Sequence, residues 1–395
     1  MPIRLEHEIL GLAAFTALAF TGSLATKLMT PALSFFLREE LRASFLGVST
    51  LTAGYMMGRS ITAYFSGRIG GRWVRLVPSF SLALNGFLTL LYPMASWWYE
   101  VSIISFLQGA LMGLTWPLIQ YLVMAIAPRG GKGRAISSYF FVGSLAGPAG
   151  DAIYGTFFGT AAVANVVVVS LSFYILSAVL AYIGSSLATR EVSPSKGDEK
   201  SVNLGERESD WRLPWLLVLG LGMGGVGSII GSSLIYILLR EWFYLSRGAV
   251  AYVLSIIGGF TVGSRLLSGY LVDRYGLRAT LRSLASLLAV GIVLVGVKEL
   301  LTVTTGLLIT SVAVGALIPA SRTYAYQLPD PAGAVGKLNS LGNVGTVLGL
   351  LAIGAGMDML KLPVRWMTPI IVFLMPFAAL VVVSSIRLYF GERTS

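Results

Sequence analysis

The chain reads Arg-Ser-Ile-Thr-Ala-Tyr-Phe-Ser-Gly-Arg-Ile-Gly-Gly-Arg at residues 59–72 and Arg-Leu-Leu-Ser-Gly-Tyr-Leu-Val-Asp-Arg-Tyr-Gly-Leu-Arg at residues 265–278. Both stretches keep arginines and a glycine at matching positions, and they lie about two hundred residues apart. Each follows one long apolar run and leads into another. A duplicated charged turn between apolar runs predicts a membrane protein built from two copies of one multi-helix unit.

Composition indicates a membrane protein before any motif does. Hydrophobic residues make up 55% of the chain, charged residues only 12%, and the mean hydropathy is +0.78, whereas a soluble domain carries about 25% charged residues. About 20 apolar residues cross the roughly 30 Å of hydrocarbon in a bilayer as a helix. Two-residue alternation, which barrel strands require, is missing. We therefore expect an all-α integral membrane protein with twelve spans at residues 9–36, 44–66, 75–95, 99–126, 135–158, 161–187, 213–239, 248–271, 278–297, 302–327, 335–357 and 366–388.

Residues 188–212 are the one clear break in composition. Their mixed charges, Ser, Gly and Pro predict a flexible linker that cannot bury itself. The linker separates two expected six-helix bundles, residues 1–187 and 213–395. Matches at an offset near 202 support the duplication: Pro117 with Pro319, Gly147 with Gly349, and Leu37-Arg38-Glu39 with Leu239-Arg240-Glu241.

The distribution of basic residues predicts an orientation. With twelve spans, 18 of the 29 Lys and Arg residues fall on the side of the two termini and seven on the other side. Basic residues are retained in the cytoplasm, so we expect both termini and the linker to be cytoplasmic and the protein to lie in the cell (inner) membrane. The net charge of +11 is then a topology signal and not a nucleic-acid footprint. We expect the first span to be retained, because no small-residue cleavage site follows it.

The second copy of the turn, Gly269-x-x-x-Asp273-Arg274-x-Gly276-x-Arg278, resembles the signature loop of the major facilitator superfamily, which joins helices 2 and 3 and again helices 8 and 9. The resemblance implies two six-helix bundles that rock around a site at the membrane midplane. It also implies that Asp273 holds the neighbouring helix ends, while the two arginines reach the other half and stabilise the outward-facing state. The two glycines would allow close packing and the tight turn.

The first copy of the turn departs from this pattern. It keeps three residues of the signature: Arg68, Gly70 and Arg72. It replaces three others, with Ala63 for the first Gly, Gly67 for the Asp and Trp73 for the last basic residue. We therefore expect the second copy to be the main gate element. The alternative is that both sets of charges only orient the chain in the membrane.

The fifth span contains Gly143-x-x-x-Gly147-Pro148, which resembles the element of drug:proton antiporters that kinks helix 5 and seals the cavity. Two departures weaken this resemblance. Asp151 stands where the element has a closing glycine, and Ser105 stands where the fourth helix of those antiporters has an arginine. A drug or multidrug proton antiporter is therefore the alternative function.

Ionisable residues inside spans are costly and usually functional. The spans contain four cations and one carboxylate: Lys27, Arg59, Asp151, Arg265 and Arg322. Spans 1, 4, 7 and 10 line the cavity in the resembled fold, which makes Lys27 and Arg322 candidate substrate ligands. Arg265 is a third candidate, because an arginine of the eighth helix binds substrate carboxylate in monocarboxylate and oxalate porters. Each has a structural alternative: Lys27 pairs with Asp151, Arg322 braces a helix end, and Arg265 serves packing alone.

Further residues of spans 4 and 10 could stack on a substrate or bond to it, with helix packing as the alternative: Trp116, Gln120, Tyr121, Tyr324 and Tyr326. No histidine lies within the spans. If transport is coupled to protons, Asp151 is the preferred carrier and Asp358 the second.

These patterns predict a secondary transporter for a small organic anion, because the cavity charges are mainly positive. The expected partners are the substrate, a proton or counter-ion, and the bilayer, with no nucleic acid and a monomeric state. No cofactor or metal is expected, since the chain lacks cysteine and any metal-ligand spacing. An enzyme or channel is disfavoured because the sequence has no catalytic cluster, nucleotide loop or selectivity filter. A sensor of the same fold that does not transport stays open as a further alternative.

Overall fold

The computed structural model describes residues 2–66, 69, 73–127, 132–188, 212–297, 299–325, 327–329, 331–359 and 368–390. Within these ranges the chain forms thirteen α-helices and no strand. The first half contains α1 (Pro2–Phe35), the π-helical turn η1 (Phe36–Glu40), α2 (Phe45–Ser66), α3 (Trp73–Thr89), the 3-10 turn η2 (Tyr92–Met94), α4 (Trp98–Ile126), α5 (Lys132–Ile153), the π-helical turn η3 (Tyr154–Phe158) and α6 (Val163–Ala188). The second half contains α7 (Arg212–Gly227), α8 (Ser233–Phe243), α9 (Arg247–Tyr275), α10 (Leu277–Val295), α11 (Leu300–Ala325), α12 (Pro331–Met359) and α13 (Thr368–Phe390).

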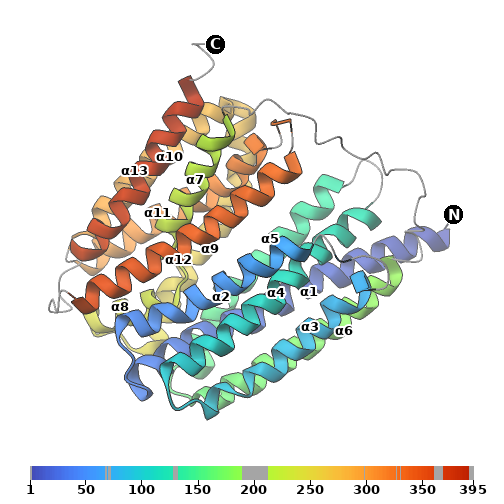
Figure 1. Ribbon diagram of the computed structural model, residues 1–395, viewed down its shortest axis with the longest axis horizontal. Helices are drawn as coiled ribbons and strands as arrows, with labels where there is room; N and C mark the ends of the chain where they lie inside the picture. Colours follow the sequence, from blue (N-terminus) through green and yellow to red (C-terminus); the bar gives the residue numbers. More distant parts are fainter. Residues whose placement is uncertain are drawn as a thin grey trace.

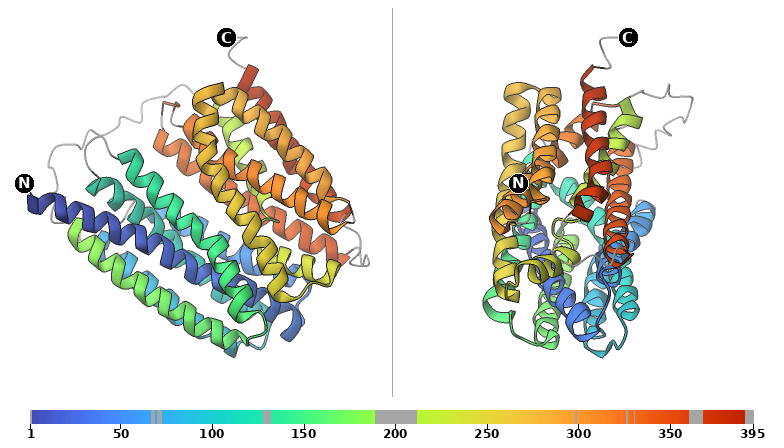
Figure 2. Two further views of the ribbon diagram at one scale, coloured as in Figure 1. Left: turned by 180° about the vertical axis from the view of Figure 1, so that it is seen from behind. Right: turned by 90° about the vertical axis from the view of Figure 1, so that its left-hand side faces the viewer.

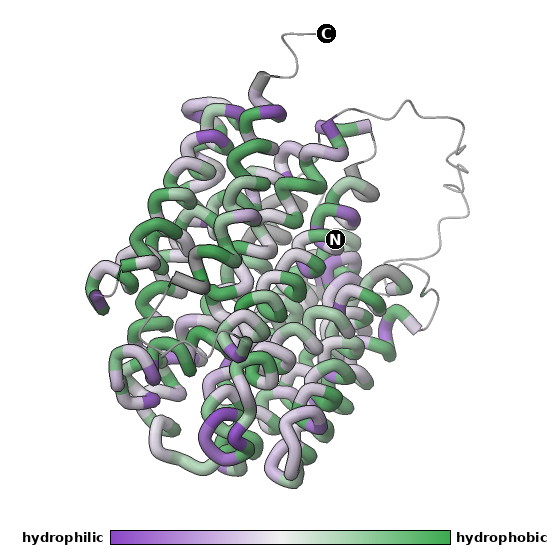
Figure 3. The backbone as a smooth tube through the Cα atoms, turned by 60° about the vertical axis from the view of Figure 1, so that its left-hand side comes forward, coloured by the Kyte–Doolittle hydropathy of each residue, from purple (hydrophilic) through white to green (hydrophobic). Residues whose placement is uncertain are grey.

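Most of these helices have the length and composition of membrane spans. Nine helices in the described ranges are long and apolar enough to cross a bilayer. Large apolar side chains point outward from them, and Phe80 and Leu301 are about 70% exposed. Hydrophobic residues run along the helices, while hydrophilic residues gather at the helix ends and in the turns (Figure 3). A helix satisfies its own backbone hydrogen bonds and can present such a surface to lipid. The protein is therefore a multi-pass membrane protein.

The expected seventh span, residues 213–239, is not one helix. It is divided into α7 and α8 by residues 228–232, so the described part of the chain has thirteen α-helices where twelve were expected. The break contains Gly231, whose φ of +69° is a left-handed conformation that glycine adopts without strain. α7 itself is rich in glycine, which has a low helix propensity.

The helices of each half pack mainly against one another. The halves meet chiefly where α2 packs on α12 and α5 on α9, and α8 also contacts α1 and α2. The two groups converge at the end of the molecule that contains η1 and α8, and they diverge toward the end that contains both termini (Figures 1 and 2). We call these the far end and the terminal end. Glycine permits the closest helix approaches: a Cβ on Gly224 of α7 would lie 1.8 Å from the carbonyl oxygen of Gly342 in α12.

Candidate functional site

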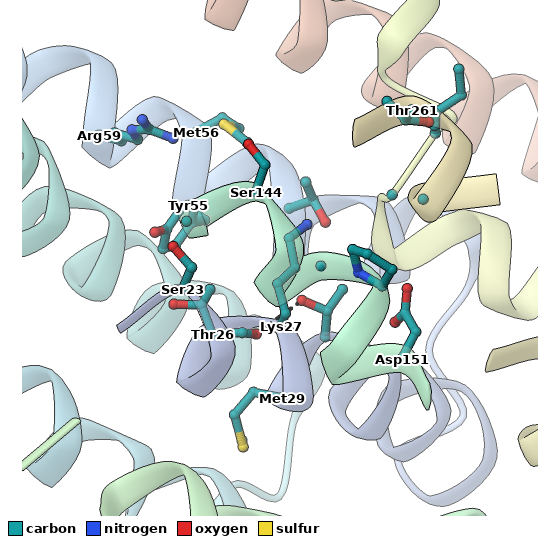
Figure 4. Close-up of a pocket in the computed structure, with 18 of the residues that line it drawn as sticks. Ser23, Thr26, Lys27, Met29, Tyr55, Met56, Arg59, Ser144, Asp151 and Thr261 are labelled. Carbon is teal, nitrogen blue, oxygen red and sulfur yellow. Dashed lines mark hydrogen bonds between the residues drawn. The ribbon is translucent and has the colours of Figure 1, made fainter. Parts of the chain in front are cut away.

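A cavity of about 460 Å³ lies between the two halves (Figure 4). Its wall is formed by side chains of α1, α2, η2, α4, α5, α6 and α9, together with Ile230 and Gly231 of the break between α7 and α8. The wall therefore combines elements from both halves of the chain. Cavities of this size accommodate small molecules.

Three cationic side chains and one carboxylate line this cavity. The cations are Lys27 of α1, Arg59 of α2 and Arg265 of α9, and the carboxylate is Asp151 of α5. Arg59 and Arg265 lie close enough to repel the Lys27 ammonium group, and Asp151 lies close enough to attract it. Figure 4 shows the Lys27 side chain directed toward Ser144, with Asp151 to one side and Arg59 on the opposite side. The cavity is positively charged on balance.

Arg265 connects α9 to α5 across the contact between the halves. Its Nη1 donates a hydrogen bond to Ser144 Oγ, and the Ser144 hydroxyl in turn donates to the Phe140 carbonyl oxygen at 2.6 Å. The Nε atom of Arg265 is buried and has no hydrogen-bond partner in the protein. The guanidinium group thus retains donors that are not used within the chain.

The Asp151 carboxylate is hydrogen-bonded to a tyrosine of the other half. Its Oδ1 accepts a 2.5 Å hydrogen bond from the Tyr236 hydroxyl, and both side chains are buried. Among the described residues no ion pair within 4.0 Å joins Asp151 to Lys27. The Lys27 Nζ atom instead faces the helix break, 3.9 Å from the position a Cβ would take on Gly231.

A neutral polar cluster lies on the side of the cavity formed by the first half. The Tyr92 hydroxyl donates to Gln108 Oε1 at 2.8 Å, and Gln108 Nε2 donates to the Asn85 carbonyl oxygen at 3.1 Å. The hydroxyl groups of Thr26 and Tyr174 share a 2.9 Å hydrogen bond. This cluster offers hydroxyl and amide groups to the cavity and contains no ionisable carboxylate or cation.

The other candidate residues fall in three places. Gln120, Gly147 and Pro148 line the cavity, and Pro148 lies inside the continuous helix α5, where its carbonyl oxygen accepts a 2.7 Å hydrogen bond from the Ser255 hydroxyl of α9. Arg322 is not among the lining residues and donates to Asn339 Oδ1 at 2.7 Å. Trp116 also lines the cavity, whereas Tyr121, which is exposed, and Tyr324, which is buried, are not among the lining residues. Four candidates lie outside the described residues: Tyr326, Arg68, Gly70 and Arg72.

The second signature loop forms the junction of α9 and α10. Gly276, with φ +79°, separates the two helices, and its N–H donates to the Val272 carbonyl oxygen at 2.9 Å. Arg274 stacks near the rings of Tyr270 and Tyr275. Gly269 and Asp273 lie in the last turns of α9, and Arg278 lies in the first turn of α10. The side chain of Asp273 lies outside the described part.

The sequence did not single out Ser144 or Tyr236 as site residues, although they hold Arg265 and Asp151. Serine and tyrosine are common in membrane helices, and nothing in their spacing distinguishes these two. In the described ranges, no group of three or more His, Cys, Asp or Glu side chains could hold a metal ion.

Comparison with solved structures shows what the fold is similar to. The chain superposes on a mutant form of the nucleoside transporter NupG (11% identity, TM-score 0.71, covering 96% of this chain and 98% of that one). It also superposes on an inward-facing, unoccupied bacterial homolog of the human lysosomal transporter Spinster (14%, 0.71, 100% and 98%). A third match is an inward-facing bacterial homologue of the iron transporter ferroportin (14%, 0.67, 99% and 99%). At these identities the likeness concerns the fold alone.

A sequence search among curated proteins finds no match. The family model for the Major Facilitator Superfamily matches residues 15–352, which is most of the chain. This match agrees with the signature loop at the junction of α9 and α10 and with the cavity between the two halves. The chain therefore belongs to the major facilitator superfamily, whose members carry small molecules across membranes.

Proposed function

We propose that this protein is a secondary active transporter that moves a small organic anion by alternating access. The moving units are the six-span bundles at residues 1–187 and 213–395, joined by the linker at 188–212, with α7 and α8 counted as one interrupted span. The membrane is the cell (inner) membrane, and both termini lie in the cytoplasm. Asp151 is the candidate proton carrier, and the protein works as a monomer.

The charge balance of the cavity carries this proposal. Three cations face one carboxylate there, and that carboxylate is hydrogen-bonded to Tyr236. Within the bilayer an unpaired cation costs roughly 2.5–3.5 kcal/mol even on insertion scales. A substrate anion would offset that cost, so the cavity is complementary to a carboxylate or phosphate ester and unfavourable for a lipophilic cation.

Arg265 is the preferred anion ligand. A guanidinium group holds a carboxylate with two parallel hydrogen bonds, which an ammonium group cannot do. Because its side chain bonds to Ser144 across the α5–α9 contact, an anion bound there would touch both halves. Lys27 would add a second positive charge from α1, and Gln120 a neutral hydrogen-bonding group.

The test is ligand binding and transport by purified protein. Small carboxylates and phosphate esters should raise the melting temperature, since a ligand at 100 times its Kd stabilises by about 2.7 kcal/mol. Counterflow of the same anions in proteoliposomes should follow, which separates a transporter from a sensor. Arg265→Lys should weaken binding about tenfold although the charge is kept, whereas Arg75→Lys, an exposed arginine of α3, should bind as the unmodified protein does.

The opposite result favours the alternative. If lipophilic cations alone raise the melting temperature, and Arg265→Lys transports normally, the organic-anion proposal is wrong. A drug or multidrug proton antiporter then becomes the better interpretation, with Asp151 as the proton carrier.

A further inference from the structure

Two turns at the far end of the molecule are structural copies of each other. One follows η1 and the other follows α8. In the described part of the chain only Arg42 (φ 50°) and Tyr244 (φ 53°) are non-glycine residues with positive φ, and they are 202 positions apart. This is the same offset that relates Leu37-Arg38-Glu39 to Leu239-Arg240-Glu241.

The hydrogen bonds of the two turns repeat at the same offset. Arg38 Nη1 donates to the Ala43 carbonyl oxygen at 2.8 Å, and Arg240 Nη1 donates to the Leu245 carbonyl oxygen at 3.3 Å. A serine directly precedes the next helix of each half, and its hydroxyl accepts a 3.2 Å hydrogen bond from a backbone N–H three residues on; these serines are Ser44 and Ser246. The duplication has thus preserved a local geometry that orients one arginine and one glutamate in each half.

The charged side chains of the two copies pair with each other across the halves. Arg38 Nε lies 2.5 Å from Glu241 Oε1, and its Nη2 donates to Glu241 Oε2 at 3.1 Å. In the opposite direction, Arg240 Nε lies 2.5 Å from Glu39 Oε1. Each Arg-Glu unit is therefore complementary to its own copy, as at an interface with two-fold symmetry.

Two further contacts reinforce the same end. Arg247, at the start of α9, also binds Glu39, with its Nε 3.2 Å from Oε2. Asp358 of α12 accepts hydrogen bonds from the backbone N–H groups of Phe45 and Leu46, at 3.0 and 2.9 Å. These N–H groups belong to the free amino-terminal turn of α2, where a carboxylate is favourable. Asp358 therefore caps a helix of the other half.

We propose that Arg38, Glu39, Arg240, Glu241 and Arg247 form a charge lock that holds the far ends of the two halves together and separates as a unit when the cavity opens toward the far face. Each pair is partly exposed, with side chains 22–35% accessible, and a single pair of this kind is weak. A movement that separates the halves would lengthen all the pairs at once. The lock concerns access to the cavity and not the substrate, so it stands whether or not the substrate is an anion.

The experiment exchanges charges within one copy or within both. Arg38→Glu with Glu39→Arg places like charges opposite each other, and so does Arg240→Glu with Glu241→Arg. Combining all four substitutions with Arg247→Glu, which also pairs with position 39, restores opposite charges at all three pairs; we call this the combined variant. The readout is a cysteine at the cavity-lining residue Thr30, in a chain that has no native cysteine, labelled with a membrane-impermeant thiol reagent in right-side-out and inside-out vesicles. A cysteine at the exposed far-end residue Ser96 identifies the far face.

Either exchange alone should raise the rate of Thr30→Cys labelling from the far face about tenfold, because several weak pairs are lost together. The combined variant should label at a rate within about twofold of that of the protein with its native charges. The lock is refuted if the single exchanges leave the far-face labelling rate unchanged, or if the combined variant labels as fast as they do. Neither result depends on a ligand, so failure of the lock and failure of the organic-anion proposal are distinguishable.

Discussion

Arg265 reaches from one half of the protein to the other through a single serine. The Ser144 hydroxyl donates its only proton to the backbone of its own helix. It can therefore only accept from the guanidinium group, and it does so. A hydrogen bond to a charged group contributes about 1.5–3 kcal/mol. Ser144 therefore acts as a positioning residue that limits where the guanidinium group can point in the cavity.

Replacing Ser144 tests this role directly. Ser144→Ala removes the acceptor and should raise the KM for the transported anion about tenfold, since the hydrogen bond to a charged group is lost. Ser144→Thr keeps the hydroxyl and should retain most of the affinity. Ser172→Ala is the matched control, because that hydroxyl bonds only within α6, to the Val168 carbonyl oxygen. An unchanged KM in Ser144→Ala would show that Arg265 is positioned by its surroundings alone.

The sequence indicated the charged members of the cavity but not their partners. Lys27, Asp151 and Arg265 stand out because an ionisable residue in an apolar run is visible without a structure. Tyr236 and Ser144 resemble any other polar residue of a membrane helix. Their roles arise only when the halves come together, since each of these hydrogen bonds joins residues more than 80 positions apart.

At the scale of elements, the interruption between α7 and α8 shapes the cavity. The break places Gly231 beside Lys27 Nζ and brings α8 close enough for Tyr236 to reach Asp151. Hydropathy predicted one continuous span here because it adds up residue types and contains no information on backbone angles. The glycines within residues 220–231 were the sequence feature that could have indicated a helix break, although glycine also occurs in continuous membrane helices.

Gly231→Ala should destabilise the protein by about 1–2 kcal/mol, because a residue with a Cβ resists the left-handed conformation. The site itself has room for the methyl group, whose nearest neighbour would be Lys27 Nζ at 3.9 Å. Gly336→Ala in α12 should instead stabilise the protein. No atom lies within 4 Å of its Cβ position, and alanine favours a helix by about 0.5–1 kcal/mol over glycine. Thermal unfolding in detergent measures both, and a Gly231→Ala variant as stable as Gly336→Ala would contradict the proposed strain.

At the scale of the whole molecule, duplication explains more than the repeated turns. The sequence indicated that residues 37–39 and 239–241 are copies of each other, and the family-model match over residues 15–352 shows the family. Neither observation indicated that the two copies lie in contact. Contact requires that both lie close to the axis relating the halves, which is a property of helix packing and not of either segment.

The orientation of the molecule is the remaining prediction at this scale. The terminal end of the bundle should face the cytoplasm, because 18 basic residues are expected on that side and seven on the other, and Lys and Arg are held back from translocation. In this cysteine-free chain, single cysteines at Ser195 and Ser395 should resist a membrane-impermeant thiol reagent in intact cells and react after the cells are opened. Ser96→Cys, an exposed residue of the far end, should react in intact cells. Labelling of Ser195→Cys or Ser395→Cys from outside, with Ser96→Cys protected, would reverse the orientation and place the charge lock on the cytoplasmic face.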